Sequence, residues 1–289
     1  MNVLWSGHHS RSSIVAVAGP SDVQVSGGGP ARGLRDLPSG DAIPPADLRA
    51  LWDFSDPAAS ADRFHQAALA APTSTRRDEL LSQRARALGL AGLPEAALDV
   101  LESITGDEVV VRVRVALEHG RIVRSAGDQL AAVLLFRAAS DLASQHGITH
   151  LAVDAIHMLA LADAGREKLW TYRGVAVASG SRDPETRRWL VALHNNLGWH
   201  LHDQELFAEA LEQFQRAIVV AHEAGRSDEE GAARWAVARC LRSLGRTRQA
   251  LEMQRELLVL RPDDEYVAEE IEILEDLTRE DPPSEGPAP

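Results

Sequence analysis

Three histidines lie where they could take part in metal chemistry. His119, His157 and His194 all fall on predicted helices, and Asp154 lies about one helical turn from His157. Zinc accepts two imidazoles and a carboxylate, so neighbouring helices that brought His157, His194 and Asp154 together would form a metal-binding or catalytic site. The chain has no local metal signature such as H-E-x-x-H, and histidines with purely structural roles are the common alternative.

Arginine pairs spaced three residues apart offer a second kind of chemistry. Arg121 and Arg124 share one face of a predicted helix, and so do Arg239 and Arg242. Like charges this close are unfavourable unless an anion lies between them, and a carboxylate would meet that need through bidentate hydrogen bonds. The alternative is a solvated face, or pairing with acidic residues of the same chain. The pairs therefore indicate either a site for an acidic partner or an internally balanced surface.

The charge distribution narrows the choice of partner. The formal net charge of the 289 residues is −13, and residues 263–289 hold eleven acidic residues against one basic residue, Arg279. The rest of the chain is nearly balanced, which argues against nucleic acid as a general partner. The acidic tail itself could dock on the arginine pairs. Arginine outnumbers lysine 29 to one, which indicates either the codon usage of a high-GC bacterial genome or a preference for bidentate contacts.

Other functional classes find little support in the sequence. No glycine-rich phosphate loop follows a predicted strand, and no nucleophile elbow is present, so we expect no cofactor and no catalysis. No apolar stretch approaches the roughly 20 residues of a membrane span. The single cysteine, Cys240, lies in an amphipathic helix and favours a buried thiol in a reducing, cytoplasmic compartment.

A helical-hairpin pattern, recurring about every 35 to 40 residues, positions these side chains. The clearest copy begins at Val191, and the others begin near Asp41, Asp78, Val113, Leu151 and Gly231. The Asp41 copy is degenerate, and the Leu151 copy is the poorest because it carries Trp170 where a small residue belongs. The segment Val109–Val115 is the only serious strand candidate.

The residue types in this pattern have a consistent physical logic. Small residues such as Gly120 and Gly198 let the two helices of a hairpin approach closely, and large residues fill the space beside them. Glycine at the fifteenth position of a copy, as at Gly92, Gly127 and Gly245, ends the first helix by adopting a positive φ. A unit of this kind cannot bury its apolar face alone, so copies must stack.

The pattern resembles the tetratricopeptide repeat family over residues 41–262. The resemblance implies an all-α, right-handed solenoid that binds proteins or peptides, and it places particular helix positions on a concave groove. Carried over to this sequence, the predicted partner-binding residues are Arg86, Arg114, Arg121, Arg124, Asn195, Trp199, His202, Trp235, Arg239 and Arg242. Trp199 and Trp235 would serve there as anchors, unless a shifted helix register buries both rings.

The sequence thus predicts an all-α solenoid that works as a non-catalytic scaffold. We expect disorder in residues 1–40 and 282–289, a repeat domain over residues 41–262, and an acidic capping helix over residues 263–281. The partner is a protein or peptide with carboxylate groups, bound in an Arg- and Trp-lined groove, and self-association is possible. The alternative is a metal-binding protein or enzyme that uses the His157, His194 and Asp154 cluster.

Overall fold

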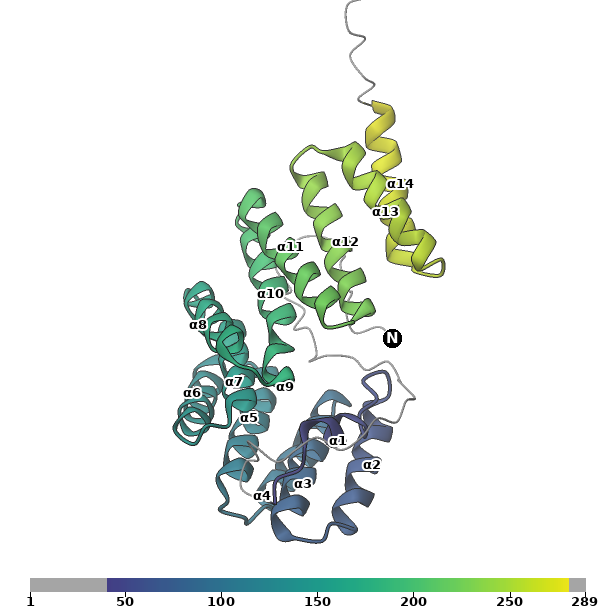
Figure 1. Cartoon of the computed structure of the whole chain (residues 1–289). Coiled ribbons are helices and arrows are strands. Elements are labelled where there is room, and N and C mark those ends of the chain that lie inside the picture. The colour runs from purple at the N-terminus through teal and green to yellow at the C-terminus, as the bar shows by residue number, and fades with distance from the viewer. Residues whose placement is uncertain (1–40, 281–289) are drawn as a thin grey trace, which may run out of the picture. The chain divides into compact units, whose positions relative to one another are not determined.

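The computed structural model describes residues 41–280, in which all regular secondary structure is helical (Figure 1). These residues divide into two compact units, unit 1 (residues 41–189) and unit 2 (residues 190–280). Both units contribute to the predicted repeat domain. The disorder expected in residues 1–40 and 282–289 lies outside the described part of the chain. In residues 41–280 no helix has the length and apolarity of a membrane span.

Unit 1 contains nine helices among its described residues. They are α1 (Pro45–Arg49), α2 (Pro57–Leu69), α3 (Ser74–Leu90), α4 (Pro94–Glu102), α5 (Val109–Ser125), α6 (Gln129–Gln145), α7 (Thr149–Ala162), α8 (Glu167–Gly180) and α9 (Pro184–Arg187). The strand candidate Val109–Val115 proves to be the first half of α5. Its valines pack in the unit's core: Val111 and Val113 are fully buried there. Helical periodicity in the residues that follow outweighs the local β-propensity of this run.

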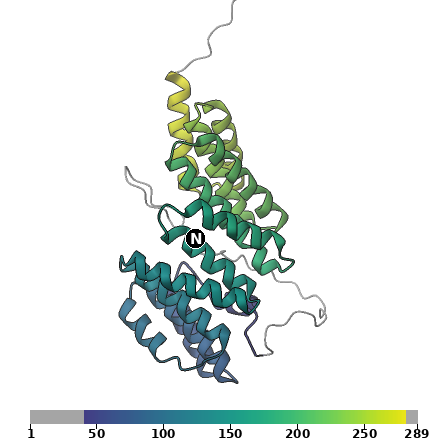
Figure 2. The ribbon, with the colours of Figure 1, turned by 90° about the vertical axis from the view of Figure 1, so that its left-hand side faces the viewer.

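Unit 2 contains five helices, consecutive along the chain. They are α10 (Trp189–Asp203, all but its first residue in this unit), α11 (Phe207–Glu223), α12 (Ser227–Ser243), α13 (Thr247–Leu260) and α14 (Glu265–Glu280). Within each unit, long helices that follow one another pack side by side, as α5 does on α6 and α6 on α7 in unit 1, and α11 on α12 and α12 on α13 in unit 2. Figure 2 shows the stacked helices of each unit. In α14, Val267 and Leu274 are buried while most of its acidic side chains are exposed, so this helix covers the end of the unit with a polar surface.

Glycine sets the close approach of the two helices in a hairpin. A Cβ built on Gly198 of α10 would lie 2.5 Å from the ring of Phe214 on α11. A Cβ built on Gly120 of α5 would lie 2.6 Å from the ring of Phe136 on α6. Both phenylalanines are fully buried. The same Gly–Phe contact therefore holds one hairpin in each unit together.

The turn after the first helix of a hairpin uses a left-handed residue. Gly92, Gly127, Gly165 and Gly245 all adopt positive φ, between 71° and 92°. In the hairpin of α10 and α11 this position is Glu205, the one non-glycine residue with positive φ among residues 41–280, at 61°. A side chain with a Cβ is disfavoured in that conformation. The best-matching copy in the sequence thus carries a strained turn.

Trp170 occupies a position where the repeat pattern expects a small side chain. The ring is only 8% exposed, and its Nε1 donates a hydrogen bond of 2.8 Å to Asp163 Oδ2. The guanidinium groups of Arg137 and Arg173 each lie 5.5 Å from the ring centroid. A polar partner and two cation–π contacts thus accommodate the large ring at the α7–α8 hairpin.

Candidate functional site

The inner face of unit 1, formed by the first helices of its hairpins (α3, α5 and α7), carries four of the predicted arginines. Two of them already hold carboxylates of the same unit. Arg114 Nε donates a hydrogen bond of 2.8 Å to Glu79 Oε2, with both side chains buried. Arg121 Nη1 donates to Glu118 Oε1 at 2.6 Å, and its Nη2 donates to Asp154 Oδ1. These two guanidinium groups are therefore internally neutralised.

The other two predicted arginines of unit 1 make no ion pair within residues 41–280. Arg86 is half-buried, and its guanidinium lies 5.4 Å from the Trp52 ring and 5.9 Å from the Phe54 ring. Arg124 is also half-buried, and its Nε is sealed from solvent without a hydrogen-bond partner. Burial lowers the pKa of both guanidinium groups, and the charge of Arg121 adds to that effect.

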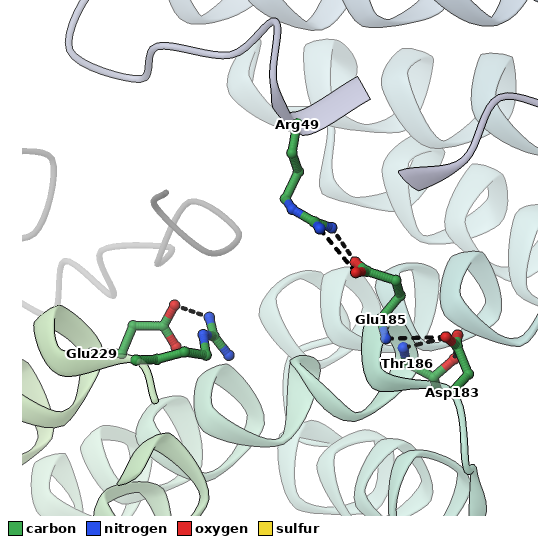
Figure 3. Close-up of polar contacts among 6 residues, drawn as sticks. Arg49, Asp183, Glu185, Thr186 and Glu229 are labelled. Atoms are coloured by element: carbon green, nitrogen blue, oxygen red, sulfur yellow. Dashed lines mark hydrogen bonds and ion pairs between the residues drawn. The ribbon is translucent and has the colours of Figure 1, made fainter. Parts of the chain in front are cut away.

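The segment assigned from the sequence to the degenerate copy that begins near Asp41 forms no long first helix; it is the short α1 with flanking loops, and it lies against this face. Residues 41–54, which we call the strap, are tied to it at several points. Arg49 makes a bidentate ion pair with Glu185, whose helix begins at the capping carboxylate of Asp183 (Figure 3). The amide of Ile43 donates to Glu79 Oε1 at 2.9 Å. The strap therefore competes with any extended peptide for the inner face of unit 1.

The strap also contributes aromatic side chains to that face. The rings of Trp52 and Phe54 stack in parallel with centroids 4.7 Å apart, and Trp52 Nε1 donates to Gln83 Oε1 at 3.3 Å. Nearby, Leu48 is buried in a cluster with Phe64 and Leu80 of the first two long helices. Apolar packing and polar contacts together anchor the strap along its length.

The inner face of unit 2, formed by the first helices α10 and α12, is built around two tryptophans. Trp199 is half-buried, with its ring centroid 6.0 Å from that of Trp235 and 4.9 Å from that of Phe214. Trp235 is only 6% exposed, so its ring is mostly part of the core. Of the two predicted anchors, Trp199 is the one that keeps a substantial part of its surface.

Polar groups extend this face from Trp199 toward the end of α12. His202 lies 5.5 Å from Trp199, ring centroid to ring centroid, and its Nε2 is 2.9 Å from Ser243 Oγ. Arg239 donates to the same Ser243 Oγ at 3.4 Å. Burial, together with the charges of Arg239 and Arg242, lowers the pKa of His202 to about 4, so the imidazole is neutral near pH 7. Asn195 is half-buried one turn before Trp199.

The two arginines of α12 have different surroundings. Arg242 Nε lies 3.1 Å from Glu270 Oε1 of α14, and the Glu270 carboxyl is almost fully buried. One carboxylate of the acidic tail therefore already occupies this arginine. Arg239 has no carboxylate partner within the described residues, although it is half-buried. Of the two predicted arginines of α12, Arg239 is thus the one without a carboxylate partner in the described chain.

The histidine cluster does not form a metal site. No group of three or more His, Cys, Asp or Glu side chains in residues 41–280 could hold a metal ion. Asp154 is committed to Arg121, and His194 Nδ1 lies 3.0 Å from Gln213 Oε1. His157 is buried against the ring of Trp189, with centroids 5.1 Å apart. Each of the three side chains thus has a contact within its own unit, and no metal site that includes them is seen among residues 41–280.

The comparison with protein families agrees with this architecture. Residues 189–262, the hairpins from α10 to α13, match the family model of the tetratricopeptide repeat. This segment carries tetratricopeptide repeats. Its fold is the all-α solenoid of stacked hairpins that the sequence predicted, and repeats of this family generally mediate protein–protein interactions. No curated protein matches the chain.

Sequence reasoning missed the carboxylates that face the arginines of this repeat protein. Glu118 lies three residues before Arg121, a spacing that already signals a pair on one helix. Asp154 and Glu79 reach their arginines from neighbouring first helices, across 33 and 35 residues of sequence. Such contacts depend on how hairpins stack, so a single helix pattern cannot reveal them.

Proposed function

We propose that unit 2 binds a protein or peptide segment that carries a carboxylate, through the inner face of α10 and α12. The observation that carries this proposal is Arg239, a half-buried guanidinium without a carboxylate partner in the described chain. It lies beside Ser243 and His202, which lead to the half-buried ring of Trp199. A peptide in which an acidic residue stands next to an apolar residue would bind such a face, with the carboxylate on the cation and the apolar side chain on the aromatic ring.

The contacts of such a peptide follow from these positions. Its carboxylate would accept hydrogen bonds from Arg239, a charge-assisted interaction that contributes about 1.5–3 kcal/mol. An adjacent apolar side chain would cover Trp199, whose ring is held in place by Phe214 and Trp235. Because the helices hold this ring rigidly, little ordering free energy is lost on binding. The proposed role is binding without catalysis, in a reducing compartment such as the cytoplasm.

Arg242 has a different part in this proposal. Its ion pair with Glu270 belongs to the packing of α14, and a substitution at Arg242 would leave a buried carboxyl without its partner. A charge reversal at Arg239 alone is therefore the cleaner test of the face. Arg216 of α11 provides the matched control, because it is exposed and its only ion pair in the described chain is a loose contact of 3.9 Å with Glu212.

The test is affinity capture from the source cell, with wild type, Arg239→Glu and Arg216→Glu as baits and mass spectrometry as the readout. We expect a partner that wild type and Arg216→Glu retain and that Arg239→Glu loses. Peptides of that partner, measured by calorimetry, should lose binding when their acidic residues are changed to amides. A partner that all three baits retain equally would place binding elsewhere on the chain.

A further inference from the structure

A hollow of about 110 Å³ lies on the inner face of unit 1, below the strap. This volume is several times the roughly 10–15 Å³ that one water molecule requires. Its walls come from the strap, α3, α5, α7 and the segment around α9, and include Trp52, Phe54, Arg86, His150, Leu151 and Trp189. The hollow therefore joins aromatic and aliphatic surface to cationic groups within one unit.

Some arginines around the hollow have a carboxylate partner, and Arg86 has none in the described chain. Several guanidinium groups on or behind its walls already have carboxylate partners: Arg49 with Glu185, Arg114 with Glu79, and Arg121 with Asp154. Arg86 is a wall residue and has no such partner in the described chain. Its nitrogens donate no hydrogen bond within residues 41–280, and none of them is sealed from solvent. A half-buried cation with free donors favours an anion beside it.

The surroundings of Arg86 fix its orientation. The stacked rings of Trp52 and Phe54 both lie within 6 Å of the guanidinium, so the flat cation is held against an aromatic surface. His150, on another wall, has its pKa lowered to about 4 by burial and by Arg114, so it adds no charge near pH 7. Beside its apolar side chains, the hollow therefore presents the oriented guanidinium of Arg86, together with Arg188 and with the ion-paired side chains of Arg49, Arg114, Asp154 and Glu185.

We propose that this hollow binds a small organic carboxylate, with the carboxylate on Arg86 and the apolar body against Trp52, Leu151 and Trp189. Guanidinium binds carboxylate through paired N–H donors, and the aromatic walls accept an apolar body. The same chemistry could come from a free organic acid or from an acidic side chain of a partner protein. The strap lies across this face, so we expect the free acid to be the ligand.

The first test is a titration of the full chain with benzoate and with benzamide, its uncharged counterpart. The readout is the NMR signal of the indole N–H groups of Trp52 and Trp189, assigned with the single Trp→Phe variants. We expect benzoate to shift both signals and to bind at least about tenfold more tightly than benzamide, because only the carboxylate uses the charge of Arg86. Equal binding of the two compounds, or no shift with benzoate, acetate or glutarate at millimolar concentration, overturns the proposal.

Variants on one helix test the role of Arg86. We expect Arg86→Gln to weaken benzoate binding about tenfold or more and Arg86→Lys to weaken it less, since the ammonium keeps the charge but not the fork of donors. Arg84→Gln is the matched control, because Arg84 lies on the same helix and contacts His65 away from the hollow. Unchanged binding in a folded Arg86→Gln variant contradicts the proposal.

Two further measurements separate the sources of the carboxylate and the two proposals. A peptide with blocked ends and a single Glu, compared with its Gln counterpart, reports on recognition of a side chain. Binding of the Glu peptide as tight as that of benzoate would assign the same carboxylate site to a partner protein. Arg239→Glu should leave benzoate binding unchanged, because Arg239 belongs to unit 2. The proposal of a carboxylate site in unit 1 and the proposal of a peptide-binding face in unit 2 can thus be contradicted independently of each other.

Discussion

The two units use similar helical hairpins but present different inner faces. In unit 1, Arg114 and Arg121 are neutralised by carboxylates from α3, α5 and α7, and the strap lies over them. In unit 2, Arg239 has no carboxylate partner among the described residues, and Trp199 stays half-buried beside it. Whether the inner face of a unit can receive a ligand therefore depends on the side chains of neighbouring first helices, and not on the backbone of the hairpins.

This difference separates structural charges from binding charges. A buried ion pair such as Arg114–Glu79 holds helices in register, and losing one member leaves an uncompensated charge in the interior. An arginine without an ion pair at a half-buried position lowers the folding stability of the unit less. Its guanidinium N–H groups remain free to donate hydrogen bonds to a ligand. Arg114 and Arg121 therefore contribute to the stability of unit 1, and we propose binding roles for Arg86 and Arg239.

The largest expected effect is on the buried ion pair of unit 1. Glu79→Gln leaves the Arg114 guanidinium buried without a charge partner, so we expect a loss of about 3–5 kcal/mol in the free energy of unfolding of unit 1. In unit 2, Glu275→Gln removes an exposed pair with Arg255 and should cost less than about 1 kcal/mol. Peptide-resolved hydrogen exchange measures each unit separately. Similar losses for the two variants would contradict the division between structural and surface charges.

Acid should destabilise unit 1 more than unit 2. Burial lowers the pKa of His150 and His157 to about 4, below the value of about 6.5 in an unfolded chain. The folded state therefore binds fewer protons between these values, and stability falls as pH drops from about 6.5 to 4. At pH 5 the loss is about 2 kcal/mol for each of these imidazoles. In unit 2, His202 has its pKa lowered to the same value and should contribute a similar loss, so unit 1, with two such imidazoles, should lose more.

Urea unfolding at pH 7 and pH 5 measures this difference between the units. The indole NMR signals of Trp170 and Trp235 report on unit 1 and unit 2 respectively. The double variant His150→Gln with His157→Gln should make the stability of unit 1 less dependent on pH over this range. A pH dependence equal in both units would show that burial of these two imidazoles is not the cause.

The smallest expected effect concerns a turn in unit 2. Glu205 adopts a positive φ at the position that Gly245 fills in the next hairpin. Glu205→Gly should relieve this strain and raise the stability of unit 2 by about 1 kcal/mol, and Gly245→Ala should lower it by a similar amount. Denaturant unfolding of the two variants measures both changes. A loss of stability in Glu205→Gly would mean that the side chain makes a compensating interaction.

The sequence was most informative about the hairpins and least informative about the charges between them. Gly120 and Gly198 could be identified as close-contact positions because their spacing from Phe136 and Phe214 repeats within single hairpins. The start of α5 was harder to predict as helix because Val109–Val115 is a β-branched run that also fits a strand. Glu79 and Asp154 were missed as partners of Arg114 and Arg121 because they come from neighbouring hairpins, and the strap was missed because residues 41–54 were assigned to the degenerate Asp41 copy.

By itself, the sequence determined the all-α hairpin architecture, since side-chain size and helical periodicity act within a few turns of one chain segment. It also placed the arginines and tryptophans on the first helices. Only the tertiary structure decided which of them remain available. Burial and ion pairing depend on side chains far apart in the sequence, such as Arg121 with Asp154, 33 residues on, and Arg242 with Glu270, 28 residues on. The stacking of hairpins neutralises some guanidinium groups and leaves Arg86 and Arg239 without a carboxylate in the described chain.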